Sequence, residues 1–424
     1  MTAGGGRRSL WRHADFMKLW TAESVSQLGS QVSMLALPLI AISILRASPF
    51  EVGLLTTVEF APFVLVGLPA GVWVDRLRRR PVLICGDLGR ALALSSIPAA
   101  YALDALTIGQ LYLVAFTTGV LTVFFDVAYQ SYLPALVEAE ELIEGNAKLE
   151  ISRSGAQIAG PGLAGVLIDL VTAPVAVLAD AISFLASATG IFLIRRHEPA
   201  PERAAGAARR GAMRREMSEG LRYVLGHRLL RPIAATTATA NLFNAAMFAV
   251  LVLWMVRELH LRPAAIGLVF AAGNVGWLVG AVASGRLAGW IGLGRAIVLP
   301  EAVGGLGAVL VPLTPRPLAI PLLIVAQFVM SFGSTAYNIN QVSLRQAITP
   351  ARLHGRMNAT MRFMVWGTLP VGSLIGGILG GTIGLRPTLW VGALGGLLSF
   401  LPAALSPVRS LASIEAAMPA AEPA

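Results

Sequence analysis

The residues best able to do chemistry in this sequence are acidic side chains inside long apolar runs. Glu23, Glu59, Asp126 and Glu301 each lie in such a run. A carboxyl group in hydrocarbon is expensive, so an acid at such a position is suspected of a function. Where hydration is poor, a carboxyl group holds its proton more readily than it does in water. Such a group can take up a proton on one side of a membrane and release it on the other.

Each acid also has a structural interpretation, in which it pairs with a base of the same protein. Asp126 could pair with Arg153, and Asp87 could pair with Arg90. We favour this structural role for Asp126 and Asp87, because both lie close to the ends of their apolar runs.

For Glu23 and Glu59 a structural role and a role in proton coupling or substrate binding stay equally open. Gln27 follows Glu23 by one helical turn. The polar stripe then continues with three serines, Ser26, Ser30 and Ser33.

The C-terminal part of the chain supplies amides where the N-terminal part supplies acids. An amide in an apolar helix can hydrogen-bond a substrate or bridge two helices, and bridging is the commoner use. The amides that we expect to line a cavity are Asn241, Asn244, Asn338 and Gln341.

The elements that must position these side chains are membrane-spanning helices. Of the 424 residues, 55% are hydrophobic and 13% are charged. A soluble domain carries about 25% charged residues. The composition therefore indicates a polytopic membrane protein whose partner is the lipid bilayer.

The sequence lacks the signatures of several other classes of protein. The net charge of +10 comes from arginines between apolar runs and reflects membrane topology, and no nucleic-acid-binding motif accompanies it. Cys85 is the single cysteine and the five histidines have no metal-ligand spacing, so we expect no disulfide framework, no metal and no cofactor. No phosphate-binding Gly-Lys-Ser/Thr element and no Gly-x-Ser-x-Gly nucleophile motif occurs. A transport function would therefore be secondary, and we do not expect an enzyme.

Apolar runs bounded by charge, proline or glycine predict an all-α membrane protein with twelve transmembrane helices in two six-helix halves. The N-terminal half covers residues 1–194 and the C-terminal half residues 232–408. A cytoplasmic linker, 195–231, joins them and is expected to end as an amphipathic surface helix, and a cytoplasmic tail covers 409–424. The predicted spans are 16–45, 52–74, 82–103, 108–133, 150–171, 174–194, 232–256, 263–289, 295–313, 318–344, 359–383 and 386–407.

The distribution of basic residues predicts the orientation of these spans. Most of the 33 Lys and Arg residues fall on one side of the membrane when both termini are placed in the cytoplasm. Positive charge in short loops favours the cytoplasmic side, so both termini are predicted to be cytoplasmic.

The two halves resemble each other at an offset of 211 to 214 residues. Tyr129–Leu133 at the end of the fourth span corresponds to Asn340–Leu344 at the end of the tenth, and Gly71 corresponds to Gly285. Parallel repeats of this kind hold their substrate between the halves near the middle of the membrane.

A charged loop between the second and third spans carries a family resemblance. The residues Gly71, Asp75, Arg76, Arg79 and Arg80 resemble the corresponding signature of the major facilitator superfamily. The resemblance implies a gating loop, whose charges lock or release neighbouring helices as they move. A plain positive-inside anchor is the alternative, and it would need the arginines but neither the glycine nor the acid. Arg78 stands where the family has a second glycine.

The fifth span carries a second resemblance, to the Gly-Pro-x-x-Gly-Gly motif of antiporters in that superfamily. Here Gly160, Pro161 and Gly165 match it, and Ala164 replaces one glycine. Proline bends a helix and glycine lets a neighbour approach, so the motif could form a seal or hinge or could serve ordinary helix packing. It favours export over uptake.

The resemblance to the superfamily extends from Phe16 to Val408. Within it, the stretch Phe125–Pro134, with Asp75-Arg76 and Asp87-x-x-Arg90, resembles the branch of enterobactin exporters and macrolide efflux pumps. The resemblance implies a monomeric bacterial inner-membrane exporter of a drug or siderophore, driven by proton antiport. The arginine that many proton-coupled members carry in the fourth span is absent here, with Arg90 and Arg153 as possible substitutes. The alternatives are an uptake symporter or a lysolipid flippase of the same fold, and then a membrane-embedded enzyme or a sensor that transports nothing.

Overall fold

The computed structural model of the chain describes residues 10–74, 76–138, 141–196, 198 and 210–417. Every regular element in these ranges is a helix, which confirms the predicted all-α class. The internal contacts divide the chain into two compact units. Unit 1 comprises Met1–Leu45 and Ala61–Ala205, and unit 2 comprises Arg46–Phe60 and Gly206–Ala424.

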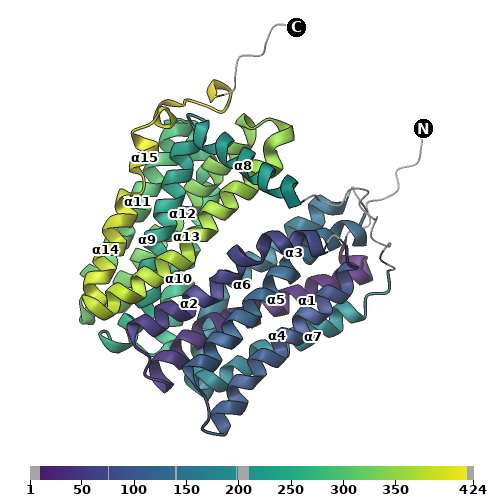
Figure 1. Cartoon of the computed structure of the whole chain (residues 1–424). Helices are drawn as coiled ribbons and strands as arrows, with labels where there is room; N and C mark the ends of the chain where they lie inside the picture. Colours follow the sequence, from purple (N-terminus) through teal and green to yellow (C-terminus); the bar gives the residue numbers. More distant parts are fainter. Residues whose placement is uncertain (1–9, 75, 139–140, 197, 199–209, 418–424) are drawn as a thin grey trace. The chain divides into compact units, whose positions relative to one another are not determined.

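Unit 1 is a helical bundle coloured purple to teal in Figure 1. Its helices are α1 (Ala14–Leu39), α3 (Gly67–Val74), α4 (Arg79–Ala102), α5 (Ile108–Leu136), α6 (Leu142–Val171) and α7 (Ala173–Phe192). The 3-10 helix η1 (Leu10–Arg12) precedes α1, and the π-helical segment η2 (Ile40–Ile44) continues it. α1 packs against α6 and α7, and α4 packs against α5 and α7. α7 therefore contacts both α1 and α4.

Unit 2 is a second bundle, in which α12 packs against α10 and α11 while α9 packs against α13 and α14. Its α-helices are α8 (Arg210–Gly226), α9 (Leu230–Arg257), α10 (Pro263–Ile291), α11 (Leu293–Leu313), α12 (Ala319–Ile348), α13 (His354–Thr382), α14 (Leu385–Leu398) and α15 (Leu401–Ala404). Its 3-10 helices are η4 (Arg316–Leu318), η5 (Ala351–Leu353), η6 (Pro407–Ser410) and η7 (Glu415–Ala417). The surface helix predicted at the end of the linker is α8, which lies against α13.

Eleven helices of the described chain are long and apolar enough to cross a membrane. The predicted span that is not among them is the second, 52–74, which is divided into α2 (Pro49–Leu65) and α3. The last predicted span, 386–407, is likewise divided into α14 and α15. α4, α5 and α6 continue through a proline, so a proline alone does not end these helices. At both breaks, however, a proline lies where its ring clashes with a helix carbonyl group four residues before it. That carbonyl belongs to the last residue of the interrupted helix in each case, Leu65 for Pro69 and Leu398 for Pro402.

Several helices extend beyond their apolar runs. α6 begins at Leu142 rather than at the predicted residue 150, and its added turns carry an ion pair of 3.3 Å between Lys148 and Glu144. Helical hydrogen bonding satisfies the backbone in water as well as in lipid. The apolar run therefore marks the part of a helix that crosses the membrane, and the helix itself can continue beyond it.

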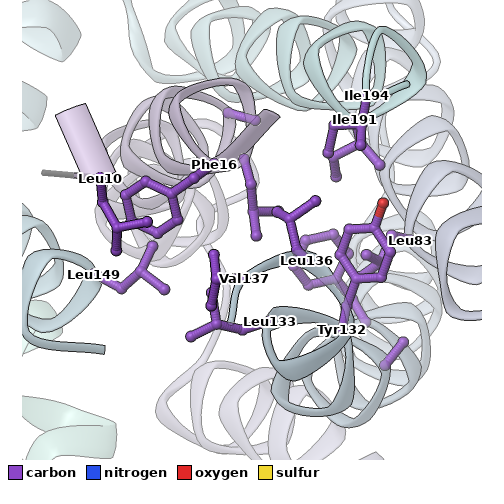
Figure 2. Close-up of a cluster of buried hydrophobic side chains, with 14 of the residues drawn as sticks. Leu10, Phe16, Leu83, Tyr132, Leu133, Leu136, Val137, Leu149, Ile191 and Ile194 are labelled. Atoms are coloured by element: carbon purple, nitrogen blue, oxygen red, sulfur yellow. The ribbon is translucent and has the colours of Figure 1, made fainter. Parts of the chain in front are cut away.

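A cluster of buried hydrophobic side chains ties together the helix ends at one end of unit 1. Figure 2 shows Phe16 of α1 beside Leu10 and Leu149, with Leu83 and Tyr132 close by. Through this cluster η1, α1, α4, α5, α6 and α7 share one core. Unit 2 has a similar cluster, which includes Val224, Ile233, Ile297, Tyr337 and Met357.

Candidate functional site

Arg90 is the centre of a charged cluster inside unit 1. It lies on α4, is 4% exposed and donates to Asp87 Oδ1 over 2.5 Å. Its guanidinium carbon lies 4.3 Å from the ring centroid of Phe125 on α5 and 4.1 Å from that of Phe184 on α7. The predicted Asp87–Arg90 pair is confirmed. With one aromatic ring on each side, Arg90 is a fixed positive charge.

Glu23 lies on α1 within the electrostatic reach of this cluster. Gln27 Nε2 donates to Glu23 Oε1 over 2.7 Å, so the predicted neighbour one turn away is its partner. The charged groups that act on Glu23 are Arg90, Asp126 and Asp87. Candidates from α1, α4 and α5 thus act on one another electrostatically, and Asp87 is the acid that forms an ion pair with Arg90.

An aromatic surface borders these acids on α5. The Tyr129 ring stacks on Phe125 at a centroid distance of 6.0 Å. Its buried hydroxyl has no hydrogen-bond partner among the described residues. Asp126, which precedes Tyr129 by about one turn, is exposed. Tyr129 was not among the predicted site residues, although it lies in a repeat motif that the sequence displays.

Arg153, the other predicted substitute for a fourth-span arginine, lies on α6. It pairs with Glu150 of the same helix at 3.8 Å, and both side chains are more than half exposed. An exposed pair of this kind contributes little to stability. Arg90 is therefore the better candidate for a fixed charge in the interior.

Asp180 on α7 is an acid that the sequence analysis missed. It is 1% exposed and accepts hydrogen bonds from Ser33 and Ser30 of α1 and from Ser183 of its own helix, at 2.5, 3.5 and 3.1 Å. The sequence contains a signal for this residue, because Asp180 interrupts the apolar run 174–194 in the same way as Glu23 interrupts the run 16–45. The serine stripe on α1 is visible in the sequence, but the residue that it faces is not.

The loop between α3 and α4 is held mainly by Glu198. The backbone amides of Arg79 and Arg80 donate to the two carboxylate oxygens of Glu198 at 2.7 and 3.1 Å, and the Arg79 guanidinium lies 3.6 Å from the same carboxylate. The Arg80 side chain donates to the carbonyl groups of Ile191 and Phe192 at the end of α7. The loop arginines therefore join the start of α4 to the end of α7.

The other loop residues contribute less. Arg76 is exposed, a Cβ added at Gly71 would meet no atom within 4 Å, and Asp75 lies outside the described residues. Arg78, at the position of the family's second glycine, has φ −68° and ψ 129°. This is extended backbone that any residue adopts, so the substitution causes no strain.

The antiporter-like motif lies where α6 contacts α1. Gly160, Pro161 and Gly165 are all buried. A Cβ at Gly160 would lie 2.7 Å from Gln31 Cβ, so only glycine allows this approach.

The predicted polar residues of unit 2 have mixed environments. Asn241 Nδ2 donates to the Val365 carbonyl group over 3.4 Å, so it bridges α9 and α13. Gln341 is buried and donates to Asn338 Oδ1 over 2.9 Å, while its own Oε1 has no partner among the described residues. Asn244 is exposed.

The two predicted acids of unit 2, Glu301 and Glu59, have different environments. Glu301 on α11 is 9% exposed and accepts a hydrogen bond of 2.8 Å from Ser399 Oγ. Glu59 on α2 is half-buried and makes no side-chain hydrogen bond or ion pair with any described residue. Thr57, two residues earlier, donates to the Pro370 carbonyl group over 3.1 Å and so attaches α2 to α13.

Several known proteins are similar to this chain in sequence or in fold. The multidrug efflux pump Tap of Mycolicibacterium fortuitum is 26% identical over 373 residues, which cover 85% of this chain and 88% of the pump. The uncharacterized MFS-type transporter YfiS of Bacillus subtilis (strain 168) is 24% identical over 387 residues, or 89% of this chain and 87% of that protein.

Among solved structures, an inward-facing bacterial homologue of the iron transporter ferroportin superposes with a TM-score of 0.76. It is 16% identical, and the match covers 94% of this chain and 99% of that one, which shows a common fold. The family model of the Major Facilitator Superfamily matches residues 19–367 and 233–417. Because that model covers nearly the whole chain, this protein belongs to the major facilitator superfamily of membrane transporters.

Proposed function

We propose that this transporter exports hydrophobic or amphipathic small molecules, such as a drug or a siderophore, by alternating access and in exchange for protons. It works as a monomer in a bacterial inner membrane, with both termini in the cytoplasm and residues 1–194 and 232–408 as its two halves. The observation that carries this proposal is Glu23, a half-buried acid of unit 1 whose hydrogen-bond partner is the neutral amide of Gln27 and on which Arg90 acts electrostatically.

The charge of this cluster supports exchange rather than simple diffusion. Arg90 already pairs with Asp87, and the hydrogen-bond partner of Glu23 is the neutral amide of Gln27. An ionised Glu23 therefore adds a negative charge that this ion pair does not compensate in an apolar surrounding. A proton or a positively charged cargo can supply the missing charge. If the two compete for it, the binding of one releases the other, which is the basis of antiport.

The aromatic side chains favour a hydrophobic cargo. Phe125 and Tyr129 form a stacked pair next to Asp126, and Trp73 and Phe124 form a second pair at 5.9 Å. Flat aromatic surface next to carboxylates suits amphipathic molecules, and aromatic cations in particular. The similarity to multidrug efflux pumps supports the same class of cargo and the outward direction.

The loop and the α6 motif fit a transporter that changes conformation. The charged contacts of Arg79 and Arg80 with Glu198 and with the end of α7 join two helix ends through side chains, so we propose that the loop gates the transport cycle. Gly71, Asp75 and Arg76 belong to the same proposal. Gly160, with Pro161 and Gly165, would let α6 slide closely along α1.

The experiment is a proton assay in inverted membrane vesicles that contain the full-length protein. The vesicles are energised, a pH-sensitive dye reports their lumen, and ethidium, erythromycin, a catecholate siderophore or a lysophospholipid is then added. Wild type is compared with Glu23→Gln and Glu59→Gln, and with Glu415→Gln as a control outside the spans. We expect at least one compound to enter the vesicles while protons leave, and Glu23→Gln to abolish this exchange.

Each other outcome contradicts a different part of the proposal. Protons that move in the same direction as the compound would indicate a symporter. A response to the lysophospholipid alone would favour a lipid flippase. Compounds that cross with no movement of protons would rule out proton antiport and leave the fold intact.

A further inference from the structure

The Asp180 carboxyl group is enclosed between α1 and α7 by hydroxyl groups. Ser33 and Ser30 approach it from α1 and Ser183 from α7, and Ser33 and Ser183 are themselves 8% and 5% exposed. The two helices meet closely here, because a Cβ at Gly29 would lie 2.8 Å from Asp180 Oδ1. In this conformation the carboxyl group is closed to water.

The hydroxyl partners of Asp180 differ chemically from the guanidinium partner of the neighbouring acid, Asp87. A guanidinium group can only donate hydrogen bonds and is always charged, so Arg90 stabilises the ionised form of Asp87 alone. A serine hydroxyl can donate or accept. It donates to an ionised Asp180, and after protonation of that acid it rotates and accepts the acid's O–H. Both protonation states of Asp180 therefore keep hydrogen-bond partners among the same side chains. The ionised form is favoured more, because hydrogen bonds to a charged group are the stronger ones.

The charged groups around Asp180 do not fix its protonation state. From α4, the charged group that acts on it is Arg90, which Asp87 already neutralises. From α1 come only the hydroxyls of Ser30 and Ser33. α6, which also contacts α7, carries its ionisable residues towards its two ends, at Glu144, Lys148, Glu150, Arg153 and Asp169.

We propose that Asp180 is the group that carries the exchanged proton, whereas Glu23 meets the cargo. This inference rests on the proposed proton antiport and specifies where its proton is held. Glu23 is half-buried and acts electrostatically on Tyr129 of α5, whereas Asp180 is enclosed in the contact between α1 and α7. When α1 and α7 separate, the serine hydroxyls part from the carboxyl group and water reaches it. The proton then leaves, and closure around the ionised form restores the three hydrogen bonds.

The test uses the full-length protein in liposomes and separates coupling from transport. The probe is ethidium or another compound that wild type exports. One assay measures its accumulation against a gradient, driven by a pH difference, and the other measures its exchange at equal pH on both sides. The variants are Asp180→Asn, which keeps the shape and can still accept from the serines, Ser33→Ala, and Asp169→Asn as the matched control on α6.

We expect Asp180→Asn to lose gradient-driven accumulation and to retain exchange at equal pH, because exchange needs no proton. Asp169→Asn should retain both. Ser33→Ala removes a hydroxyl that favours the charged form, so the pH profile of accumulation should move upward by about one unit.

Two results would overturn the inference. One is an Asp180→Asn variant that still accumulates the probe and moves protons. The other is a folded variant that loses exchange as well, since this would indicate a purely structural role. If Asp180→Asn does not fold, an unchanged pH profile in Ser33→Ala overturns the inference instead. Failure of the antiport itself is seen separately. In that case, wild-type protein accumulates no more probe with a pH difference than without one.

Discussion

The N-terminus of α4 in unit 1 and that of α11 in unit 2 are equivalent positions in the two halves, and they are capped by different groups. In unit 1 the amides of Arg79 and Arg80 donate to a carboxylate, that of Glu198. A negative charge at this place is favourable, because it meets the unpaired amides and the positive end of the helix dipole.

In unit 2 the same two positions, one repeat later, donate to backbone. The amides of Leu293 and Gly294 lie 3.1 and 2.8 Å from the carbonyl oxygens of Ala412 and Leu411. In both units, the segment that follows the last helix returns to cap an earlier one. Unit 1 uses a side-chain charge for this contact, and unit 2 uses none.

The interiors differ in the same way. Unit 1 contains an ion pair, Asp87 with Arg90, among further acids. The polar contacts in the core of unit 2 include a hydrogen bond of 2.6 Å between the hydroxyls of Thr237 and Tyr337, and the acid there, Glu301, is satisfied by a serine. The comparison teaches that charge-dependent stability is concentrated in unit 1, the unit to which we assign proton exchange.

The largest effect should come from removal of one partner of the buried ion pair. Asp87→Leu leaves Arg90 charged and uncompensated between two aromatic rings, which should cost about 3–5 kcal/mol of stability. The double variant with Arg90→Leu should recover most of this loss. Glu301→Gln in unit 2 should cost only about 1 kcal/mol, because it replaces one hydrogen-bond acceptor by another. Thermal unfolding of the purified protein in detergent measures all three. A double variant no more stable than Asp87→Leu would contradict the explanation.

The second effect concerns the backbone cap of unit 2. Gly294→Ala would bring a methyl group to 2.6 Å from the Arg409 carbonyl carbon, and backbone cannot move aside as a side chain can. We expect a loss of about 1–3 kcal/mol in thermal unfolding. Gly285→Ala is the matched control in the same unit, because a Cβ there meets no atom within 4 Å. Equal losses in the two variants would show that helix glycines, rather than the cap, decide the stability.

The sequence predicted features that depend on near neighbours. Each membrane crossing needs about 20 apolar residues, so the spans could be read directly. Asp87 and Arg90, three residues apart on one helix, could be paired from their spacing alone. The breaks at Pro69 and Pro402 could not be predicted in this way, because Pro98, Pro134 and Pro161 lie inside unbroken helices.

Contacts between distant segments could not be predicted in this way. Asp180 and Ser33 are 147 residues apart, and Arg79 and Glu198 are 119 residues apart. Their pairing depends on which helices are neighbours, and apolar periodicity does not contain that information. The same reason explains why Asp180 was missed although it is an acid in an apolar run.

A third test exchanges residues between the equivalent turns of the two units. Thr172 has φ 79° and ψ 155°, and Gly384, 212 positions later, has φ 95° and ψ 166°. This region suits glycine and costs another residue about 1–3 kcal/mol. Thr172→Gly should therefore stabilise the protein by about 1 kcal/mol once the added freedom of the unfolded chain is subtracted. Gly384→Thr should destabilise it. Shifts of the same sign in the two variants would contradict the equivalence.

A fourth test weakens the carboxylate cap of unit 1. Glu198→Gln keeps one acceptor oxygen but loses the charge and one backbone contact, so we expect a loss of about 1 kcal/mol. Glu198 is 8% exposed, so its charge is screened only in part, and added salt should reduce the difference between the variant and wild type by a fraction of that loss. Thermal unfolding at low and high salt measures this. The Gly294→Ala loss should not depend on salt, and a salt dependence in both variants would remove the distinction between the two caps.

The smallest effect concerns the one titratable cap identified in unit 2. His227 precedes α9, and its Nδ1 accepts from the amides of Leu229 and Leu230 at 3.2 and 3.4 Å. Burial lowers the pKa of His227 below its usual 6.5. Between the lowered pKa and 6.5 the unfolded chain binds more protons than the folded one, so stability is complete above pH 6.5 and falls as the pH decreases. Because the ring is only partly buried, the loss should stay below about 1 kcal/mol.

His227→Asn separates this contribution from the other acid-sensitive groups, because its side-chain oxygen can cap the helix and does not titrate. The equivalent residue of unit 1, His13, caps α1 in the same manner, with its Nδ1 3.0 Å from the Phe16 amide, and it stays unchanged in the variant. As the pH decreases from about 8 to about 5, the unfolding temperature of wild type should fall relative to that of His227→Asn. If the two proteins show parallel profiles, the cap does not titrate in this range, and the acid sensitivity comes from other groups.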